Sequence, residues 1–336
     1  MARYIRRRKE LVGRSVGALI LLTLLVAVHA RAQRPAPSAS GRESNPTQAK
    51  AKKKRLPERT FVLVGAGDIA SCKYPDGARA TAKLIEQIPG TVFAAGDLVY
   101  EKGSAENFKN CYDPTWGRFK DRTRPALGNH DYENHKTSSY FQYWGEHAGP
   151  LGKGYYSYDL GDWHIVALNT NCDEKDLGGC GAGSPEETWL KEDLAKHPTA
   201  CILAYGHHAL FSSGVFKKHA VHPELKPFWG DLYAAHADLV LAGHEHSYER
   251  FAPQDPEGQA DPVNGIREIV VGTGGRSHDL LGFATPNSEI REWDTYGVLK
   301  LTLSPGKYDW EFIPEEGKSF HDAGSGVCHN YPTEAN

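Results

Sequence analysis

Three patterns are missing from this sequence, and each absence excludes a class of protein. No two of the six cysteines stand in C-x-x-C spacing, which disfavours a cysteine-based metal site. The apolar stretch 16–28 falls short of the ~20 residues that a helix needs to cross a bilayer. No internal repeat or second linker interrupts residues 60–330. The 336 residues allow one large domain or two small ones, and this absence favours one domain over 60–330.

The N-terminus has the layout of a cleaved secretory signal peptide, residues 1–32. Arg6 to Lys9 are basic, residues 16–28 are apolar, and Ala30-Arg31-Ala32 offers a cleavage site. An uncleaved membrane anchor is the competing interpretation, which the short apolar run disfavours. Twin-arginine export through Arg7-Arg8 competes with the general secretory route. Glu10 stands where twin-arginine signals prefer an apolar residue, which favours the general route.

The charge balance of the remaining chain is acidic. Residues 1–32 hold seven basic residues and one acidic residue, so removing them changes the formal net charge from −3 to −9. Such a chain is a poor candidate for sequence-independent nucleic-acid binding. Residues 33–59 are rich in Pro, Ser, Ala and Lys without hydrophobic periodicity, which predicts a disordered linker.

Export would make the six cysteines available for disulfides. Six cysteines allow 15 pairings, and the sequence does not choose among them outright. Cys172 and Cys180 flank a short Gly-rich loop, so we expect them to pair. Cys72 and Cys111 both lie just beyond candidate metal loops, and Cys201 and Cys328 would then be left over.

Five expected strands each stop at a glycine that is followed by a side chain able to bind metal. One such loop is an ordinary turn, but five together predict a site. The central one is the strand 91–95, which ends in Gly96 and Asp97 and is followed by Tyr100. The other four glycines precede Asp68, Asn129, His207 and His244, the last within His244-Glu245-His246.

The order of elements predicts an α/β protein. Strand 61–66, a helix over 76–88 capped by Asp76 and strand 91–95 form a β-α-β unit, which favours a parallel pair. A capping box at Ser184 starts a second helix that runs to about residue 196, and Pro227 starts a third over 227–236. We expect further strands and one short helix, at 124–127, 138–145, 155–159, 163–168, 200–205, 238–242, 266–271, 296–303 and 308–313.

The chemistry of these side chains points to two metal ions. Carboxylate, phenol, amide and imidazole together suit Fe, Zn or Mn. His244 and His246 are too far apart to share one small coordination sphere comfortably, so each would hold its own ion, with Asp97 bridging. Two ions ~3.5–4 Å apart can clamp the attacking and leaving oxygens of a phosphoryl displacement. Gly272-Thr273-Gly274-Gly275 lacks the Lys and Ser/Thr of a phosphate loop and reads as a tight turn.

The five blocks resemble those of calcineurin-like metallophosphoesterases, in order, over about residues 61–275. More narrowly they are similar to the purple acid phosphatases, because Ala70 stands where most of the superfamily has a histidine, and Tyr100 follows the bridging Asp97 by three residues. The resemblance implies a four-layer α/β/β/α sandwich of two mixed sheets flanked by helices. It also implies a bacterial member without the N-terminal fibronectin-like domain of the large plant enzymes.

The resemblance further implies the ligands of each ion. Fe(III) would take Asp68, Asp97, Tyr100 and His246, and Fe(II), Zn or Mn would take Asp97, Asn129, His207 and His244. His130 would contact the phosphate or the leaving group. His208 and His219 lie where the family often has further imidazoles. We expect Asp131 to orient His130.

The function implied is exported hydrolysis of small phosphate monoesters by metal-bound hydroxide, in the periplasm or outside the cell. A phosphodiesterase or nucleotidase on the same scaffold is the rival within the enzymes, and a degenerate phosphate-ester binding protein is the rival outside them. Structural or solvent-exposed roles are expected for six other histidines: His164, His197, His222, His236, His278 and His329.

Overall fold

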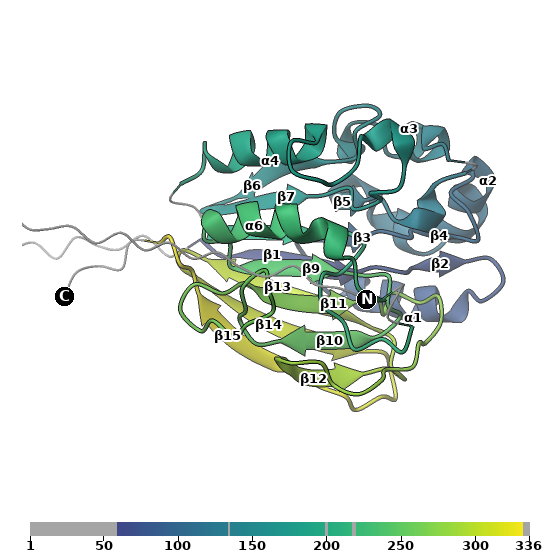
Figure 1. Ribbon diagram of the computed structural model, residues 1–336. Helices are drawn as coiled ribbons and strands as arrows, with labels where there is room; N and C mark the ends of the chain where they lie inside the picture. Colours follow the sequence, from purple (N-terminus) through teal and green to yellow (C-terminus); the bar gives the residue numbers. More distant parts are fainter. Residues whose placement is uncertain (1–58, 134, 199–200, 217–219, 332–336) are drawn as a thin grey trace, which may run out of the picture. The chain divides into compact units, whose positions relative to one another are not determined.

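The computed structural model describes residues 59–133, 135–198, 201–216 and 220–331 (Figure 1). The expected signal peptide, residues 1–32, and the expected linker up to residue 58 lie outside these ranges. Among the described residues, no helix combines the length and the apolar character that crossing a membrane requires.

The first large sheet has six strands in the order β15-β14-β13-β1-β3-β5. Strands β1, β3 and β5 run parallel to one another, whereas β13 pairs antiparallel with β1. The sheet is therefore mixed, and its parallel half contains three of the strands expected to carry ligands. The bounds are β1 Phe61–Ala66, β3 Thr91–Ala95, β5 Thr123–Ala126, β13 Gly297–Ser304, β14 Lys307–Pro314 and β15 Ala323–Val327.

The second large sheet has seven strands in the order β12-β10-β11-β9-β8-β7-β6. Strands β7, β8, β9 and β11 are parallel, and the strands at both ends run antiparallel to their neighbours. The bounds are β6 Tyr156–Leu160, β7 Trp163–Ala167, β8 Cys201–Tyr205, β9 Leu239–Ala242, β10 Tyr248–Phe251, β11 Arg267–Val271 and β12 Ser288–Glu292. A short parallel pair joins β2, Ala70–Ser71, to β4, Val99–Tyr100.

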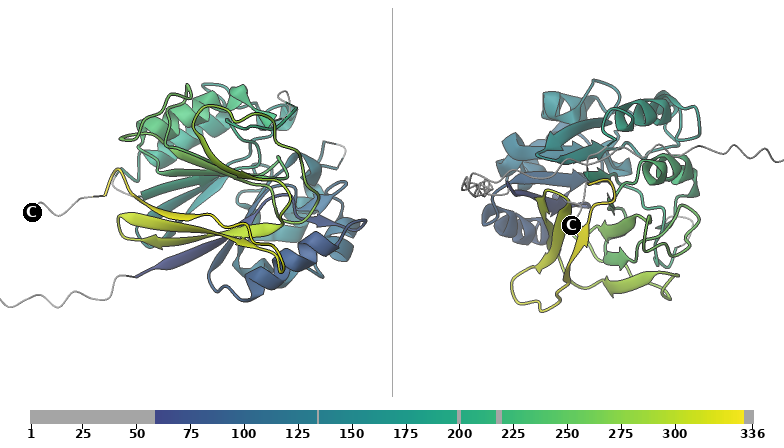
Figure 2. Two further views of the ribbon diagram at one scale, coloured as in Figure 1. Left: turned by 90° about the horizontal axis from the view of Figure 1, so that it is seen from below. Right: turned by 90° about the vertical axis from the view of Figure 1, so that its left-hand side faces the viewer.

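The helices lie on the outer faces of the two sheets (Figure 2). Helix α1, Asp76–Glu86, covers the six-stranded sheet, and α4, Pro185–Leu194, with α6, Lys226–Ala234, covers the seven-stranded one. Two shorter helices are α2, Ala105–Asn107, and α3, Ser138–Trp144. The remaining helical turns are Phe108–Tyr112, Trp116–Arg122, Asn129–Asp131, Gly145–Ala148, Lys175–Leu177 and Pro223–Leu225.

Strand β8 shows why the protein has four layers. Its residues are all buried, and they alternate between two cores because successive side chains point to opposite faces of a sheet. Leu203 and Tyr205 join the core between the two sheets. Ile202 and Ala204 join a second core under α4 and α6, with Leu190 and other helix residues. The apolar run is thus explained by burial on both faces, and the expected α/β/β/α architecture is confirmed.

Several local expectations differ from the structure. Asp76 is the first residue of α1 rather than its cap, a position that Pro75 holds without a side-chain bond. Ser184 does cap α4, but the Glu187 carboxylate accepts from the Gly183 amide and so forms only half of a capping box. Strands β10, β12 and β15 were not expected from the sequence.

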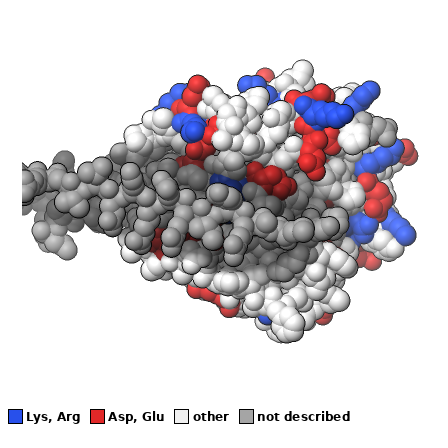
Figure 3. All heavy atoms as spheres, viewed as in Figure 1, with Lys and Arg blue, Asp and Glu red and all other residues white. Residues whose placement is uncertain are grey.

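Three disulfides join the six cysteines. Cys172–Cys180 closes the loop that the sequence indicated. Cys72–Cys111 and Cys201–Cys328 complete the set. On the coloured part of the face in Figure 3, basic and acidic side chains are interspersed and form no continuous basic surface.

Candidate metal centre

The candidate site lies at the carboxyl ends of parallel strands from both sheets. Strands β1, β3 and β5 end just before Asp68, Asp97 and Asn129, and β8 and β9 end just before His207 and His244. Parallel strands present these ends at the same edge of a sheet, and the two sheets face one another. Residues far apart in the sequence are thereby brought together.

The backbone at three of these positions adopts a left-handed conformation that non-glycine residues rarely take. The φ angles are +60° at Asp68, +50° at Asp97 and +70° at His244. Such conformations cost about 1–3 kcal/mol each and cluster at functional sites. The glycines before the ligands relieve crowding: a Cβ at Gly128 would lie 2.2 Å from an Asp97 carboxylate oxygen.

Tyr100 is the hub of one group of donor atoms, here called the first half-site. Its hydroxyl oxygen lies 2.8 Å from both Asp68 Oδ1 and Asp97 Oδ2 and can donate its one hydrogen to either. It also lies 3.2 Å from His246 Nε2, which is 3.2 Å from Asp68 Oδ1. The four residues expected to bind the first ion therefore bring their ligand atoms together.

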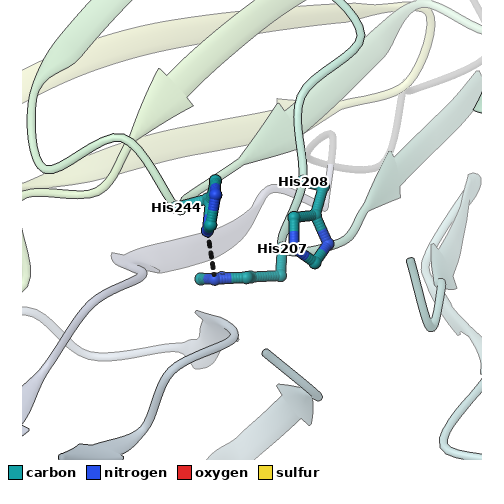
Figure 4. A group of neighbouring side chains, drawn as sticks. All are labelled: His207, His208 and His244. Carbon is teal, nitrogen blue, oxygen red and sulfur yellow. Dashed lines mark hydrogen bonds between the residues drawn. The ribbon is translucent and has the colours of Figure 1, made fainter. Parts of the chain in front are cut away.

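His207 is the hub of the second half-site. Its Nε2 lies 3.2 Å from Asn129 Oδ1, 3.2 Å from His244 Nδ1 and 3.4 Å from Asp97 Oδ1. These are the four donors predicted for the second ion. Figure 4 shows the His207–His244 contact, with the two rings nearly perpendicular.

The donor set fits two metal ions. Asp97 faces the first half-site with Oδ2 and the second with Oδ1, as a bridging carboxylate would. Donor separations of 2.8–3.4 Å resemble the edge of about 3 Å that octahedral ligands have at metal distances of 2.0–2.1 Å. Asp68, Asp97 and His207 are almost fully buried, and burying such groups without a counter-charge is costly.

The outer nitrogens of two histidines are fixed by hydrogen bonds. His207 Nδ1 donates to the Ala95 carbonyl at 2.9 Å, which directs Nε2 inward. His246 Nδ1 bonds Ser277 Oγ at 2.6 Å, and its backbone amide donates to Asp279 Oδ2. Partners of this kind orient metal-binding imidazoles and select their tautomer.

The charges and the burial within the site shift the pKa values of its histidines in opposite directions. Burial opposes the charged form of His207, but the Asp97 carboxylate outweighs it and raises the pKa of His207 to about 9. Burial and the neighbouring His207 lower the pKa of His244 to about 3. Burial, with Asp68 and Asp97 beside it, raises the pKa of Tyr100 well above 10.

His130 and Asp131 take different places beside the site. His130 Nδ1 donates to the Glu101 carbonyl at 2.8 Å, and its ring leans over Tyr100 at 4.5 Å. Asp131 was expected to orient His130, and this is wrong. Its carboxylate accepts from the amides of Leu98 and Gly128, and so ties together the loops after β3 and β5.

Two further histidines, His208 and His222, lie beside the second half-site. Thr170 Oγ1 accepts from the amides of His207 and His208, and its hydroxyl faces His208 Nδ1 at 2.9 Å. Burial and the other imidazoles hold the pKa of His208 well below its usual range. The His222 ring lies 4.2 Å from that of His208 and 5.4 Å from that of His244.

His222, for which the sequence interpretation expected a structural or exposed role, lies beside the second half-site. Together with Asn129, Thr170, Asn171 and His208 it lines a cavity of about 110 Å³. His219 lies outside the described residues. Thr170 and Ser277 were missed altogether, because neither stands beside a Gly-ligand block and a hydroxyl carries no motif.

Comparisons with known proteins point to one family. The model of the calcineurin-like phosphoesterase family matches residues 61–248. Probable purple acid phosphatase 20 of Arabidopsis thaliana is 29% identical over 70% of this chain and 57% of its own length. Purple acid phosphatase 21 of the same plant is 29% identical over 76% and 61%, so the chain spans about 60% of these curated relatives. A purple acid phosphatase from yellow lupin (Lupinus luteus) seeds has a TM-score of 0.63 at 19% identity, over 83% of this chain and 57% of that one.

Proposed function

Since this chain belongs to the calcineurin-like phosphoesterase family, we propose that it is an exported phosphomonoesterase with a dinuclear metal centre. The single observation that carries the proposal is the pair of hubs. Tyr100 and His207 each lie within 3.4 Å of three further donors, and Asp97 belongs to both groups.

The residues of each half-site suit different ions. Asp68, Tyr100 and Asp97 are oxygen donors that become anionic when bound, a hard set that favours Fe(III). Asn129, His207 and His244 are neutral donors when bound, which suits a divalent ion such as Fe(II), Zn or Mn. We therefore assign Fe(III) to the first half-site and a divalent ion to the second.

The ions would lower the pKa of a water molecule to about 7 and neutralise charge on the phosphoryl group. The protein contributes orientation and hydrogen bonds. His208 stays neutral because its pKa is lowered, so with Nδ1 facing Thr170 it can donate from Nε2 to a phosphate oxygen. His130, held through Nδ1 by the Glu101 carbonyl, would use its other ring nitrogen, Nε2, to contact the phosphate or the leaving group.

The cavity size supports small monoesters as substrates. A volume of about 110 Å³ lies well below the ~300–1,000 Å³ of pockets that enclose drug-sized ligands. We assign the phosphoryl group to the part of this cavity beside Asn129 and His208, away from Asp173, Glu174 and Glu224, which also line it, with the leaving group at the open surface. Export is supported by the three disulfides, which persist in oxidising compartments.

Purified protein, metal analysis and a panel of phosphate monoesters and diesters at several pH values test the proposal. The expected result is two metal ions per chain and faster turnover of monoesters than of diesters. Faster turnover of diesters would mean that the protein is a phosphodiesterase and not a phosphomonoesterase. Two bound metals without turnover of any ester would leave a binding protein instead of an enzyme.

A further inference from the structure

Arg276 stands directly behind the first half-site. It follows the turn Gly272–Gly275, which packs on the end of β1, where the Gly274 amide donates to the Gly67 carbonyl. The Arg276 amide donates in turn to the Asp68 carbonyl at 3.0 Å. Because its backbone is bonded to the residue that carries a proposed ligand, Arg276 is fixed relative to the site.

The Arg276 side chain lies against the ring of Tyr100. Its guanidinium carbon is 4.8 Å from the centre of that ring and 5.5 Å from the centre of the Tyr74 ring. The Tyr100 hydroxyl meanwhile points to Asp68, Asp97 and His246. The cation therefore contacts the ring itself, while the oxygen faces the proposed ion.

The counter-charge of Arg276 is more exposed than Arg276 itself. Arg276 Nη2 donates to Glu101 Oε1 at 2.7 Å, and the side chains are 16% and 61% exposed. Water screens an exposed carboxylate more strongly than a largely buried cation. The Tyr100 ring therefore experiences a net positive field from this pair.

We propose that Arg276 is a positioning residue that acts through Tyr100 and stabilises its phenolate when a metal ion is bound. The inference rests on the proposed function, because it requires Tyr100 to bind iron. A cation near an aromatic face is attracted to its electrons, more strongly when partly desolvated. The attraction lowers the energy of the electrons that a phenolate donates to Fe(III), which sets the colour. It also favours the phenolate over the phenol, a much weaker ligand, and so increases the retention of that ion.

Charge variants of this pair test the proposal in the iron-loaded, full-length exported protein. Arg276→Gln removes the cation, and the visible charge-transfer band should move to longer wavelength. The first ion should also be lost to a chelator roughly tenfold faster, the factor that corresponds to about 1.4 kcal/mol. Arg276→Lys keeps the charge and should restore most of both properties.

Glu101→Gln gives the test its direction. It removes the counter-charge but keeps the carbonyl that holds His130, so the band should move to shorter wavelength, opposite to Arg276→Gln. Arg79→Gln is the matched control, since Arg79 pairs with Asp76 at 3.1 Å on the exposed surface of α1, and its band should stay at the wild-type position.

The outcomes separate this inference from the proposed function. A coloured, active wild type whose band stays in place in both Arg276→Gln and Glu101→Gln overturns the role of Arg276 alone. Shifts in the same direction in these two variants overturn it as well. The variants remove opposite charges, so a charge effect must move the band in opposite directions, whereas a structural disturbance need not. A wild type that binds two metals without a visible band overturns both the iron assignment and the role of Arg276.

Discussion

Two clusters of imidazoles and carboxylates in this protein are built differently. In the remote cluster of Asp159, His164, Asp193 and His197, the buried His164 bonds Asp159 Oδ1 at 2.9 Å and Asp193 Oδ2 at 2.8 Å. The His197 ring stacks on it at 3.6 Å and 15°. In the candidate metal centre the rings of His207 and His244 stand at 79°, and their nitrogens point at each other.

The difference shows what distinguishes a metal site from a satisfied group of histidines. Both clusters bring three potential ligands within 4.8 Å of one another, so proximity does not separate them. In the remote cluster each ring nitrogen of His164 faces one carboxylate, and the protonated ring can donate to both. In the metal centre, Nε2 of His207 meets Asp97, Asn129 and Nδ1 of His244 at once, which is more than one proton can satisfy, whereas a metal cation can bind all four groups. The predictions below are ordered by their expected effect on turnover.

Asp97→Ala should have the largest effect, because Asp97 belongs to both half-sites. We expect loss of both ions and a fall in turnover of at least about 10³-fold, since the ions supply several kcal/mol of transition-state stabilisation. Metal analysis and steady-state kinetics measure the two losses. A variant that retains two ions and the wild-type rate would contradict the dinuclear centre.

His244→Ala and His246→Ala should each disturb mainly one ion, because the two imidazoles belong to different half-sites. The expected metal content is close to one ion per chain in each variant, with the divalent ion lost from the first and iron lost from the second. Element-resolved metal analysis distinguishes the two. Loss of the same ion from both variants would argue against separate half-sites.

Tyr100→Phe should have a smaller effect on rate. The substitution removes a hard anionic donor and its charge transfer to Fe(III), so we expect the visible band to disappear while the fold and part of the activity remain. Absorption spectroscopy, circular dichroism and kinetics on one preparation check this. A colourless wild type that is fully active with divalent ions alone would keep the phosphoesterase and remove the iron assignment.

His164→Gln should leave metal content and turnover unchanged and reduce only stability. Breaking a buried ion pair typically costs about 3–5 kcal/mol, which denaturant unfolding measures. Burial opposes the charged form, but Asp193 and Asp159 outweigh it and raise the pKa of His164. Its stabilisation is therefore full below the ordinary histidine pKa of about 6.5 and is lost as the pH rises through the folded-state value.

The difference in unfolding free energy between wild type and His164→Gln should consequently be largest at low pH and become smaller as the pH rises. Loss of a metal ion from His164→Gln would break the distinction between the two clusters.

The candidate ligands could be predicted because each is encoded locally. A buried strand, a glycine and a polar side chain are neighbours in the sequence, and parallel strands bring such neighbours to one edge. His222, Thr170 and Arg276 could not be found this way, since their positions depend on loops that only the folded chain brings together.

Strand β15 was missed for a different physical reason. Its sequence, Ala-Gly-Ser-Gly-Val, has no alternating apolar pattern. Its two glycines leave space for aromatic rings of the neighbouring strand β14. A Cβ at Gly324 would lie 2.2 Å from the Trp310 ring, and one at Gly326 would lie 2.2 Å from the Tyr308 ring. A strand whose glycines make room for the aromatic side chains of its neighbour has no alternating hydrophobic pattern in its own sequence.

The pairing of β1 with β13 makes the candidate site depend on a strand that is synthesised late. Strand β1 carries Asp68 at its end, yet Phe61 pairs with Leu303, near the other end of the described chain. A chain that stops before β13 lacks the antiparallel partner of β1, so only β3 pairs with the strand that precedes Asp68. The candidate site should therefore form fully only after β13 has been synthesised, and chains truncated before Gly297 should be inactive.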